Sequence, residues 1–234
     1  MAAKRRSPVA TAPLDADAVL AELARLGKRA DPKSLLRFGI VTAPAYGLAM
    51  ADVHKLAKRV GTRPDLVEAL WRSEVYEARL LCAFVHDPAK VTPTQMDRWC
   101  RTFDNWGIVD TLCFKLWDRT PHALTKVDAW CTRAPEFEKR AAFALLACLA
   151  LHGKDLDDAE FERRLPLCEA AATDARNFVK KGVLWALNAM GRRGAVLRRA
   201  TLALCERMAG GDDKTARWVG KTALREIGKA MARG

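Results

Sequence analysis

The sequence predicts an all-helical fold, a solenoid of antiparallel helix pairs. Three observations support this prediction. Apolar residues recur at the three-to-four-residue spacing of helices from Asp15 onward, no segment alternates convincingly like a strand, and short Pro- or Gly-containing connections separate the segments. A chain of 234 residues can bury a sizeable core within one domain. We therefore expect a single domain over residues 14–234, preceded by a disordered basic tail at residues 1–13.

The expected helix boundaries follow from capping residues, prolines and glycines. Asp15 or Asp17 can cap a first helix that runs to about Leu26, and a less regular stretch follows through Pro32 and Pro44. Further boundaries are expected near Thr62-Arg63-Pro64, Asp87-Pro88, Thr92-Pro93-Thr94-Gln95, Thr120-Pro121, Ala134-Pro135, Gly153, Thr173, Gly191, Gly194 and Gly210-Gly211.

The spacing of similar segments indicates a helical repeat. Trp106 and Arg140 are 34 residues apart, and Arg140 and Trp185 are 45 apart, close to the roughly 40 to 47 residues of HEAT and armadillo units. The segment FEKRAAFALLACLALH (137–152) also resembles FVKKGVLWALNAMGRR (178–193). The fold is thus predicted to be a HEAT-like or armadillo-like α-solenoid, and a compact irregular helical bundle is the alternative.

Composition excludes several classes of protein. Half of the residues are hydrophobic and 29% are charged, the balance of a globular chain. No stretch approaches the roughly 20 apolar residues of a membrane span, and the first residues lack the apolar core of a signal peptide. We expect a cytoplasmic protein. Seven cysteines occur singly in apolar segments and are predicted to be buried: Cys82, Cys100, Cys113, Cys131, Cys148, Cys168 and Cys205.

Positive charge is concentrated at the C-terminal end. Residues 172–234 contain 14 Lys or Arg against 5 Asp or Glu. Near the N-terminus, Lys4, Arg5 and Arg6 add three positive charges, and the net charge of the remaining residues is zero. A clustered excess of cations is what a phosphate-binding surface needs, so we expect a concave basic face that binds DNA. The alternative is a solvated basic surface with no partner.

Trp106 and Asp110 form the most suggestive pair in the sequence. They lie four residues apart in FDNWGIVD (103–110), so on a helix the indole and the carboxylate share one face. A carboxylate beside an aromatic ring suits the cation that develops on the sugar when a glycosidic bond breaks. The alternative is a core tryptophan beside a solvent-facing or capping aspartate.

Arg140 and Trp185 are the other two candidate residues of the inner face. Arg140 follows Lys139 at the start of an apolar helix and could hold a phosphate through two hydrogen bonds, or could pair with Glu136 or Glu138. Trp185 follows a basic cluster and could contact sugars or bases, or pack in the core. The candidate DNA-binding residues are Arg140, Lys139, Arg176, Lys180, Lys181, Arg192, Arg193, Arg217 and Lys221.

Other kinds of chemistry lack support in the sequence. The four histidines stand apart from one another and from acidic clusters, so we expect no metal site. Phosphate-loop, GxSxG and HExxH motifs are missing, and no cofactor is expected. We predict that the remaining tryptophans are core residues: Trp71, Trp99, Trp117, Trp130 and Trp218.

Several stretches together resemble the AlkD-like DNA alkylation repair proteins, which are HEAT-like-repeat DNA glycosylases. The resemblance runs from about Arg37 to Ala230. The matching stretches are RFGIVTAPAYGLAMADVHKLAKRVG (37–61), FDNWGIVD (103–110), EKRAAFALLACLA (138–150), NFVKKGVLWAL (177–187) and ARWVGKTALREI (216–227).

The resemblance implies a monofunctional glycosylase of base excision repair that hydrolyses the N-glycosidic bond of cationic N3- or N7-alkylpurines without base flipping. It implies that Asp110 stabilises the oxocarbenium ion and positions water, that Trp106 and Trp185 pack on the deoxyribose, and that Arg140 holds a backbone phosphate. The sequence departs from the family pattern at Gly107, where Asp is frequent, and at Asn188, where Arg is common.

Two other functions remain open from the sequence. The first is a noncatalytic solenoid that recognises damaged or bent DNA, and the second is a protein-binding scaffold. The expected partner is double-stranded DNA that contains alkylated bases, bound by a monomer. The Ala- and Arg-rich composition is typical of a bacterium with GC-rich DNA, in which the protein would associate with the nucleoid.

Overall fold

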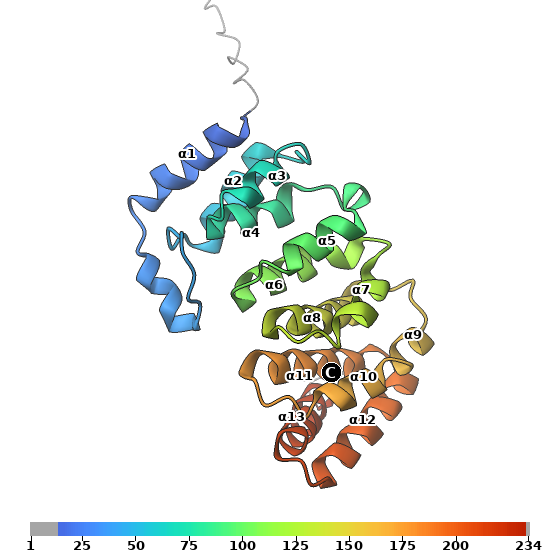
Figure 1. Cartoon of the computed structure of the whole chain (residues 1–234). Coiled ribbons are helices and arrows are strands. Elements are labelled where there is room, and N and C mark those ends of the chain that lie inside the picture. The colour runs from blue at the N-terminus through green and yellow to red at the C-terminus, as the bar shows by residue number, and fades with distance from the viewer. Residues whose placement is uncertain (1–13, 233–234) are drawn as a thin grey trace, which may run out of the picture.

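The computed structural model describes residues 14–232, and the predicted basic tail at residues 1–13 lies outside this range. Within it the chain forms α-helices and short 3-10 helices, with no strand. The helices follow one another along a curved double row, which Figure 1 shows as a continuous progression from α1 to α13. This confirms the α-solenoid and excludes the irregular bundle.

Six helices form a central row, in which each helix packs against the next. They are α2 (Met50–Val60), α4 (Tyr76–Val85), α6 (Trp106–Lys115), α8 (Glu136–His152), α11 (Asn177–Arg193) and α13 (Lys214–Met231). The two segments predicted to be repeats are α8 and α11. They lie side by side, with the rings of Phe137 and Phe178 5.2 Å apart between centroids. The internal similarity therefore marks consecutive structural units.

The other helices form a second row that packs on the first, and within this second row α9 contacts α12. They are α1 (Ala16–Gly27), α3 (Val67–Arg72), α5 (Pro93–Cys100), α7 (Ala123–Trp130), α9 (Asp158–Glu162), α10 (Leu165–Ala171) and α12 (Ala195–Gly210). Three 3-10 helices complete the described chain: η1 (Pro32–Phe38), η2 (Pro88–Lys90) and η3 (Trp117–Arg119).

Local capping explains most of the helix ends. The Asp15 carboxylate accepts the N–H of Ala18 at 2.8 Å, and Thr92 caps α5 through the N–H of Gln95 at 3.1 Å. Helix α8 begins after Pro135 and ends before Gly153, both at expected boundaries. Gly191 is a correction, since it lies inside α11 and not at its end.

The core between the two rows contains all seven cysteines, each a buried free thiol, as predicted. Burial raises the pKa of these thiols, for example that of Cys168. Trp71 and Trp99 stack face to face in the core, with centroids 4.1 Å apart, and Trp117 and Trp130 are fully buried beside them. None of the described helices has the length and apolar character needed to cross a bilayer.

Candidate active site and nucleic-acid interface

Asp110 and Arg140 form a bidentate ion pair between α6 and α8. Arg140 Nε donates to Asp110 Oδ1 at 2.9 Å, and Arg140 Nη2 donates to Oδ2 at 2.7 Å. The third bond of the guanidinium runs from Nη1 to the carbonyl oxygen of Phe178 on α11, at 2.8 Å. The pair thus links three consecutive helices of the central row.

This geometry gives Arg140 a partner that is neither Glu136 nor Glu138. Its side chain is only 8% exposed, and three of its five N–H groups are bonded to Asp110 and Phe178. Arg140 also lines the site groove, and its contact with a phosphate stays a prediction. Burial raises the pKa of the Asp110 carboxyl, while the charge and hydrogen bonds of Arg140 oppose that shift. Arg140 therefore orients Asp110 and favours its ionised form.

Trp106 begins α6 one turn before Asp110. Asn105 caps the helix by accepting the N–H of Ile108 at 3.0 Å, and the Trp106 indole donates through Nε1 to the carbonyl oxygen of Phe38 at 3.0 Å. The ring is partly buried against the core. The same-face placement expected from the four-residue spacing is present, and the indole is held in one orientation by a residue 68 positions earlier.

Two hollows adjoin Trp106 and Asp110. The first, which we call the site groove, has a volume of about 400 Å³ and includes Arg140, Phe178 and Lys181 in its lining. The second, which we call the side cavity, has a volume of about 610 Å³ and lies between η1, the loop that follows it and α6. Asp110 borders both hollows, and its side chain is 21% exposed. The carboxylate is thus accessible although its helix is packed.

Gly107 is closely packed against Tyr76 and Ile40. A Cβ atom at this position would lie 2.6 Å from the hydroxyl oxygen of Tyr76 and 3.1 Å from Ile40. Tyr76 is buried and lines the side cavity. The sequence departs from the family pattern at Gly107, and the hydroxyl group of Tyr76 occupies the space that a side chain at residue 107 would need.

Trp185 lies one turn after Lys181 on α11, half-buried against the core. It lines neither the site groove nor the side cavity. Its contact with a deoxyribose stays a prediction. Asn188, one turn further along, is buried, and its side-chain amide donates to Glu226 on α13.

Trp218 is the one predicted core tryptophan that lies at the surface. Its exposed fraction is 41%, and the Lys180 ammonium lies 5.0 Å from the centroid of its ring. The apolar residues around Trp218 in the sequence belong to the buried face of α13, whereas its own side chain points away from that face. The prediction that Trp218 is buried was wrong.

The predicted DNA-binding residues fall into two groups. Four have a carboxylate partner within the protein, namely Arg140 with Asp110, Lys139 and Arg176 with Asp174, and Arg193 with Asp158. For the other five no carboxylate partner occurs among residues 14–232: Lys180, Lys181, Arg192, Arg217 and Lys221. Within the second group Lys180 lies over the Trp218 ring and Arg217 donates to the Gly211 carbonyl oxygen, so these five cations are those without a competing carboxylate in the described chain.

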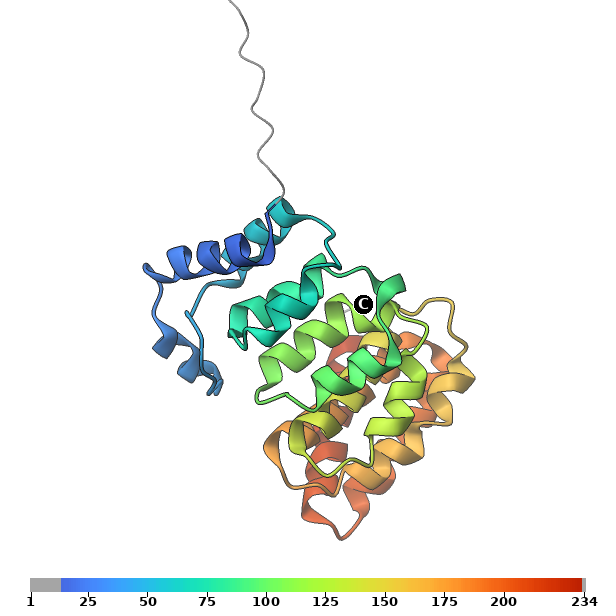
Figure 2. The ribbon, with the colours of Figure 1, turned by 45° about the horizontal axis from the view of Figure 1, so that its top comes forward.

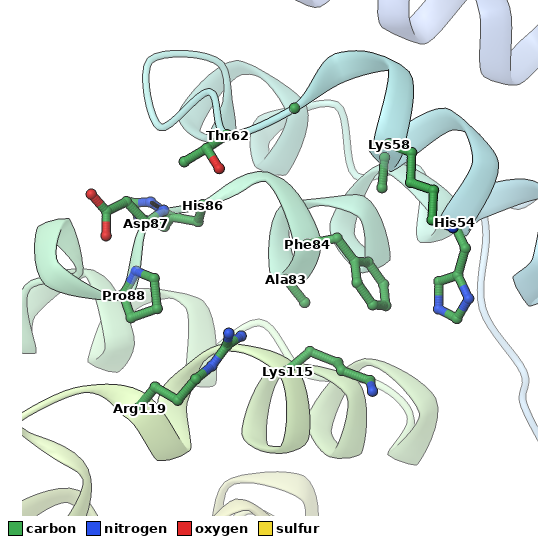
Figure 3. A pocket seen from close by; sticks show the side chains of 12 residues that line it. His54, Lys58, Thr62, Ala83, Phe84, His86, Asp87, Pro88, Lys115 and Arg119 are labelled. Carbon is green, nitrogen blue, oxygen red and sulfur yellow. Dashed lines mark hydrogen bonds between the residues drawn. The ribbon is translucent and has the colours of Figure 1, made fainter.

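The ends of the central helices distinguish the two edges of the row. The site groove lies at the N-terminal ends of α6, α8 and α11, where the helix dipoles favour negative charge. At the opposite edge, a 590 Å³ pocket lies at the C-terminal ends of α2, α4 and α6 (Figure 3). Its Lys58 and Lys115 complement the negative ends of those dipoles. The N-terminal edge is therefore the one at which the helix dipoles favour an anionic ligand.

Sequence reasoning missed the residues that surround Trp106. Phe38 lies in both hollows, and the buried Glu77 carboxylate accepts the backbone N–H groups of Tyr46, Gly47 and Leu48 at 2.6 to 3.1 Å. The signal for Glu77 is its place in a helix whose only other charged residue is Arg79. In the described part of the chain, no three His, Cys, Asp or Glu side chains gather as a metal site would require.

The fold is that of a helical-repeat protein of the HEAT-like class. A solved structure has a similar fold, with a TM-score of 0.78 at 19% identity, over 94% of this chain and 95% of the other. That protein is described as one of a new family related to the HEAT-like repeat DNA glycosylases, with affinity for branched DNA structures. No curated protein matches the sequence.

The family follows from the sequence itself. The model of the DNA alkylation repair enzyme family matches residues 19–230, nearly the whole chain. The chain belongs to this family.

Proposed function

We propose that this protein is a monofunctional DNA glycosylase that excises cationic N3- or N7-alkylpurines from double-stranded DNA. The observation that carries the proposal is the Asp110 carboxylate, held by Arg140 and exposed to the site groove beside Trp106. An oriented carboxylate at a partly desolvated site can stabilise a developing positive charge more strongly than water does.

The reaction is a hydrolysis at the anomeric carbon of the deoxyribose. The glycosidic bond breaks with its electron pair going to the purine, which leaves as a neutral base because alkylation has already made it cationic. The sugar becomes an oxocarbenium ion, which the negative Asp110 stabilises. Water then attacks the cation and loses a proton, and an abasic site remains. The sugar has to reach Asp110, whereas the base stays in the stack.

DNA binding rests on the unpaired cations of α11 and α13. Lys181 lines the site groove directly, and Lys180, Lys221 and Arg217 extend the positive surface toward α13. Together with the helix N-termini at this edge, these side chains suit the phosphates on either side of a lesion. The protein is proposed to act as a monomer.

The test is base release from DNA that contains N7-methylguanine, with enzyme in excess. The wild type is expected to release free base, and Asp110→Asn is expected to slow the single-turnover rate by about 100-fold or more. Duplex affinity should not fall, because the substitution frees the Arg140 guanidinium in the groove. The absence of release by a wild type that binds the duplex would reject the enzymatic proposal.

Asp155→Asn is the matched control. Asp155 lies in the loop after α8, is exposed, and lines neither the site groove nor the side cavity. Its substitution should leave the rate unchanged. Because Asp110→Asn leaves Arg140 without its counter-charge, circular dichroism and thermal unfolding of the variant should accompany the assay.

A second function is favoured by the ion pair of Asp110 with Arg140. Both carboxylate oxygens already accept bonds from Arg140, which reduces the negative charge available to a sugar cation. The structurally similar protein has affinity for branched DNA structures. A noncatalytic protein that binds damaged or branched DNA would use the same cations, and it predicts salt-sensitive binding without product from any lesion.

A further inference from the structure

Three apolar side chains near the end of η1 are exposed. The exposed fractions are 57% for Leu36, 54% for Phe38 and 74% for Val41. Figures 1 and 2 show that the segment between α1 and α2, which contains these residues, projects to one side of the helices. Exposed aromatic and branched residues that cluster at a projecting turn usually have a partner. We name Leu36, Phe38 and Val41 the apolar tip.

The tip is firmly held. Leu35 and Ile40, which flank Leu36 and Phe38, are buried, and the Ile40 N–H donates to the Leu35 carbonyl oxygen at 3.2 Å, which closes the turn. Gly39 adopts a left-handed φ of +68° directly after Phe38. The turn therefore presents the Phe38 ring on a closed, anchored loop, as an inserting residue requires.

The tip also adjoins the proposed active site. The Phe38 carbonyl oxygen accepts the Trp106 indole N–H at 3.0 Å, and Phe38 lines the site groove together with Asp110 and Lys181. A duplex placed with a sugar at Asp110 would bring its neighbouring base steps to Phe38.

The charges next to Phe38 fit DNA. From Pro32 to Thr42 the charged residues are Lys33 and Arg37, both cationic and exposed, whereas the carboxylates of Asp31 and Asp104 lie at the two ends of this stretch, where Asp31 caps η1 and Asp104 accepts the Thr42 hydroxyl. The Arg37 guanidinium lies 4.7 Å from the centroid of the Phe38 ring, so a positive charge accompanies the aromatic side chain. An apolar ring flanked by cations matches a base stack flanked by phosphates.

We propose that Phe38 is a wedge that inserts into the DNA base stack beside the lesion, with Leu36 and Arg37 supporting it against the strand. Apolar side chains that enter a base step unstack it and kink the duplex. The wedge would expose the sugar to Asp110 while the damaged base remains within the helix. This inference rests on the proposed binding of DNA at the site groove, and it does not require that excision follows.

The test uses 2-aminopurine, whose fluorescence rises when it is unstacked. Duplexes carry a tetrahydrofuran abasic analogue, with 2-aminopurine either next to it or six pairs away, so that no excision is needed. The wild type should raise the fluorescence of the adjacent probe and leave the distant probe unchanged. Phe38→Ala should abolish the rise and weaken binding to the abasic duplex by about tenfold, whereas Phe38→Leu should retain part of both.

Val196→Ala is the matched control, because Val196 is 56% exposed on α12 and distant in sequence from the tip. It should behave as the wild type. The wedge would be overturned if Phe38→Ala raised the 2-aminopurine fluorescence as much as the wild type does. It would also be overturned if the wild type did not bind the duplex, or bound it and left the adjacent probe stacked. Base release with no adjacent unstacking would reject the wedge alone, and unstacking without base release would reject the glycosylase alone.

Discussion

Asp110 shows how a single residue depends on partners that are distant in the chain. Its position four residues after Trp106 placed both on one helical face, but its charge, accessibility and orientation depend on Arg140, 30 residues later. The carboxylate is neither a cap nor fully solvated, the alternatives open from the sequence. The buried guanidinium keeps it oriented beside the groove.

Gly107 supplies a prediction at the same scale. Gly107→Ala should destabilise the protein by about 1–3 kcal/mol, because its methyl group would meet the Tyr76 hydroxyl at 2.6 Å. It should also slow excision, since Trp106 and Asp110 lie on the same turns of α6. Adding Tyr76→Phe removes the oxygen and should restore at least half of the lost stability. Urea unfolding of the two single variants and the double variant measures the coupling, and additive losses would contradict this packing.

At the scale of elements, the contact between α11 and α13 explains why one helix boundary predicted from a glycine was wrong. Gly191 was expected to end a helix, as glycines commonly do. It is instead a close-approach site, since a Cβ there would lie 2.5 Å from the Cδ1 atom of Ile227 on α13. The helix continues to Arg193 and stops at Gly194, which was also expected as a boundary. A packing glycine and a terminating glycine are identical in a local pattern.

Arg192 and Arg193 make a matched pair of variants at the end of α11. Arg193 donates to Asp158 and to the carbonyl oxygens of Ala150, Gly153 and Leu156, which ties the end of α8 to α11. Arg193→Met should therefore cost about 2–4 kcal/mol of stability. Arg192 is exposed at the C-terminal end of α11, away from the site groove, so Arg192→Met should leave both the stability and the salt slope of DNA binding unchanged.

Thermal unfolding and binding isotherms at several salt concentrations test these two expectations. A destabilised Arg192→Met or a fully stable Arg193→Met would show that the assignment of the two residues is reversed.

At the scale of the whole molecule, the solenoid brings together an early segment and the middle of the chain. The side cavity is formed by η1, the following loop and α6, so its walls come from residues 31–50 and from Tyr76, Trp106 and Asp110. The loop stays in place because Glu77 binds three of its backbone N–H groups. A cavity of about 610 Å³ beside a candidate catalytic carboxylate is large enough for a small ligand.

Filling the side cavity tests whether the base stays in the stack. Ala49 is exposed at the cavity, so Ala49→Trp should occupy it without disturbing the core. If the base remains stacked, single-turnover excision and duplex affinity should match those of the wild type and of the Ala49→Ser control. A large selective loss of excision in Ala49→Trp would mean that the damaged base enters the cavity.

The amino-acid sequence was enough to predict the helical repeat, most helix ends, the basic C-terminal third and the Trp106 and Asp110 pair. Helix ends and the Trp106 and Asp110 pair depend on neighbours within a few residues, where spacing and capping act directly. The pairing of Arg140 with Asp110, the exposure of Trp218 and the position of Phe38 at the groove are visible only in the folded chain. Each of these depends on which helices meet, and the packing of buried faces across the solenoid sets that at separations of 30 residues or more.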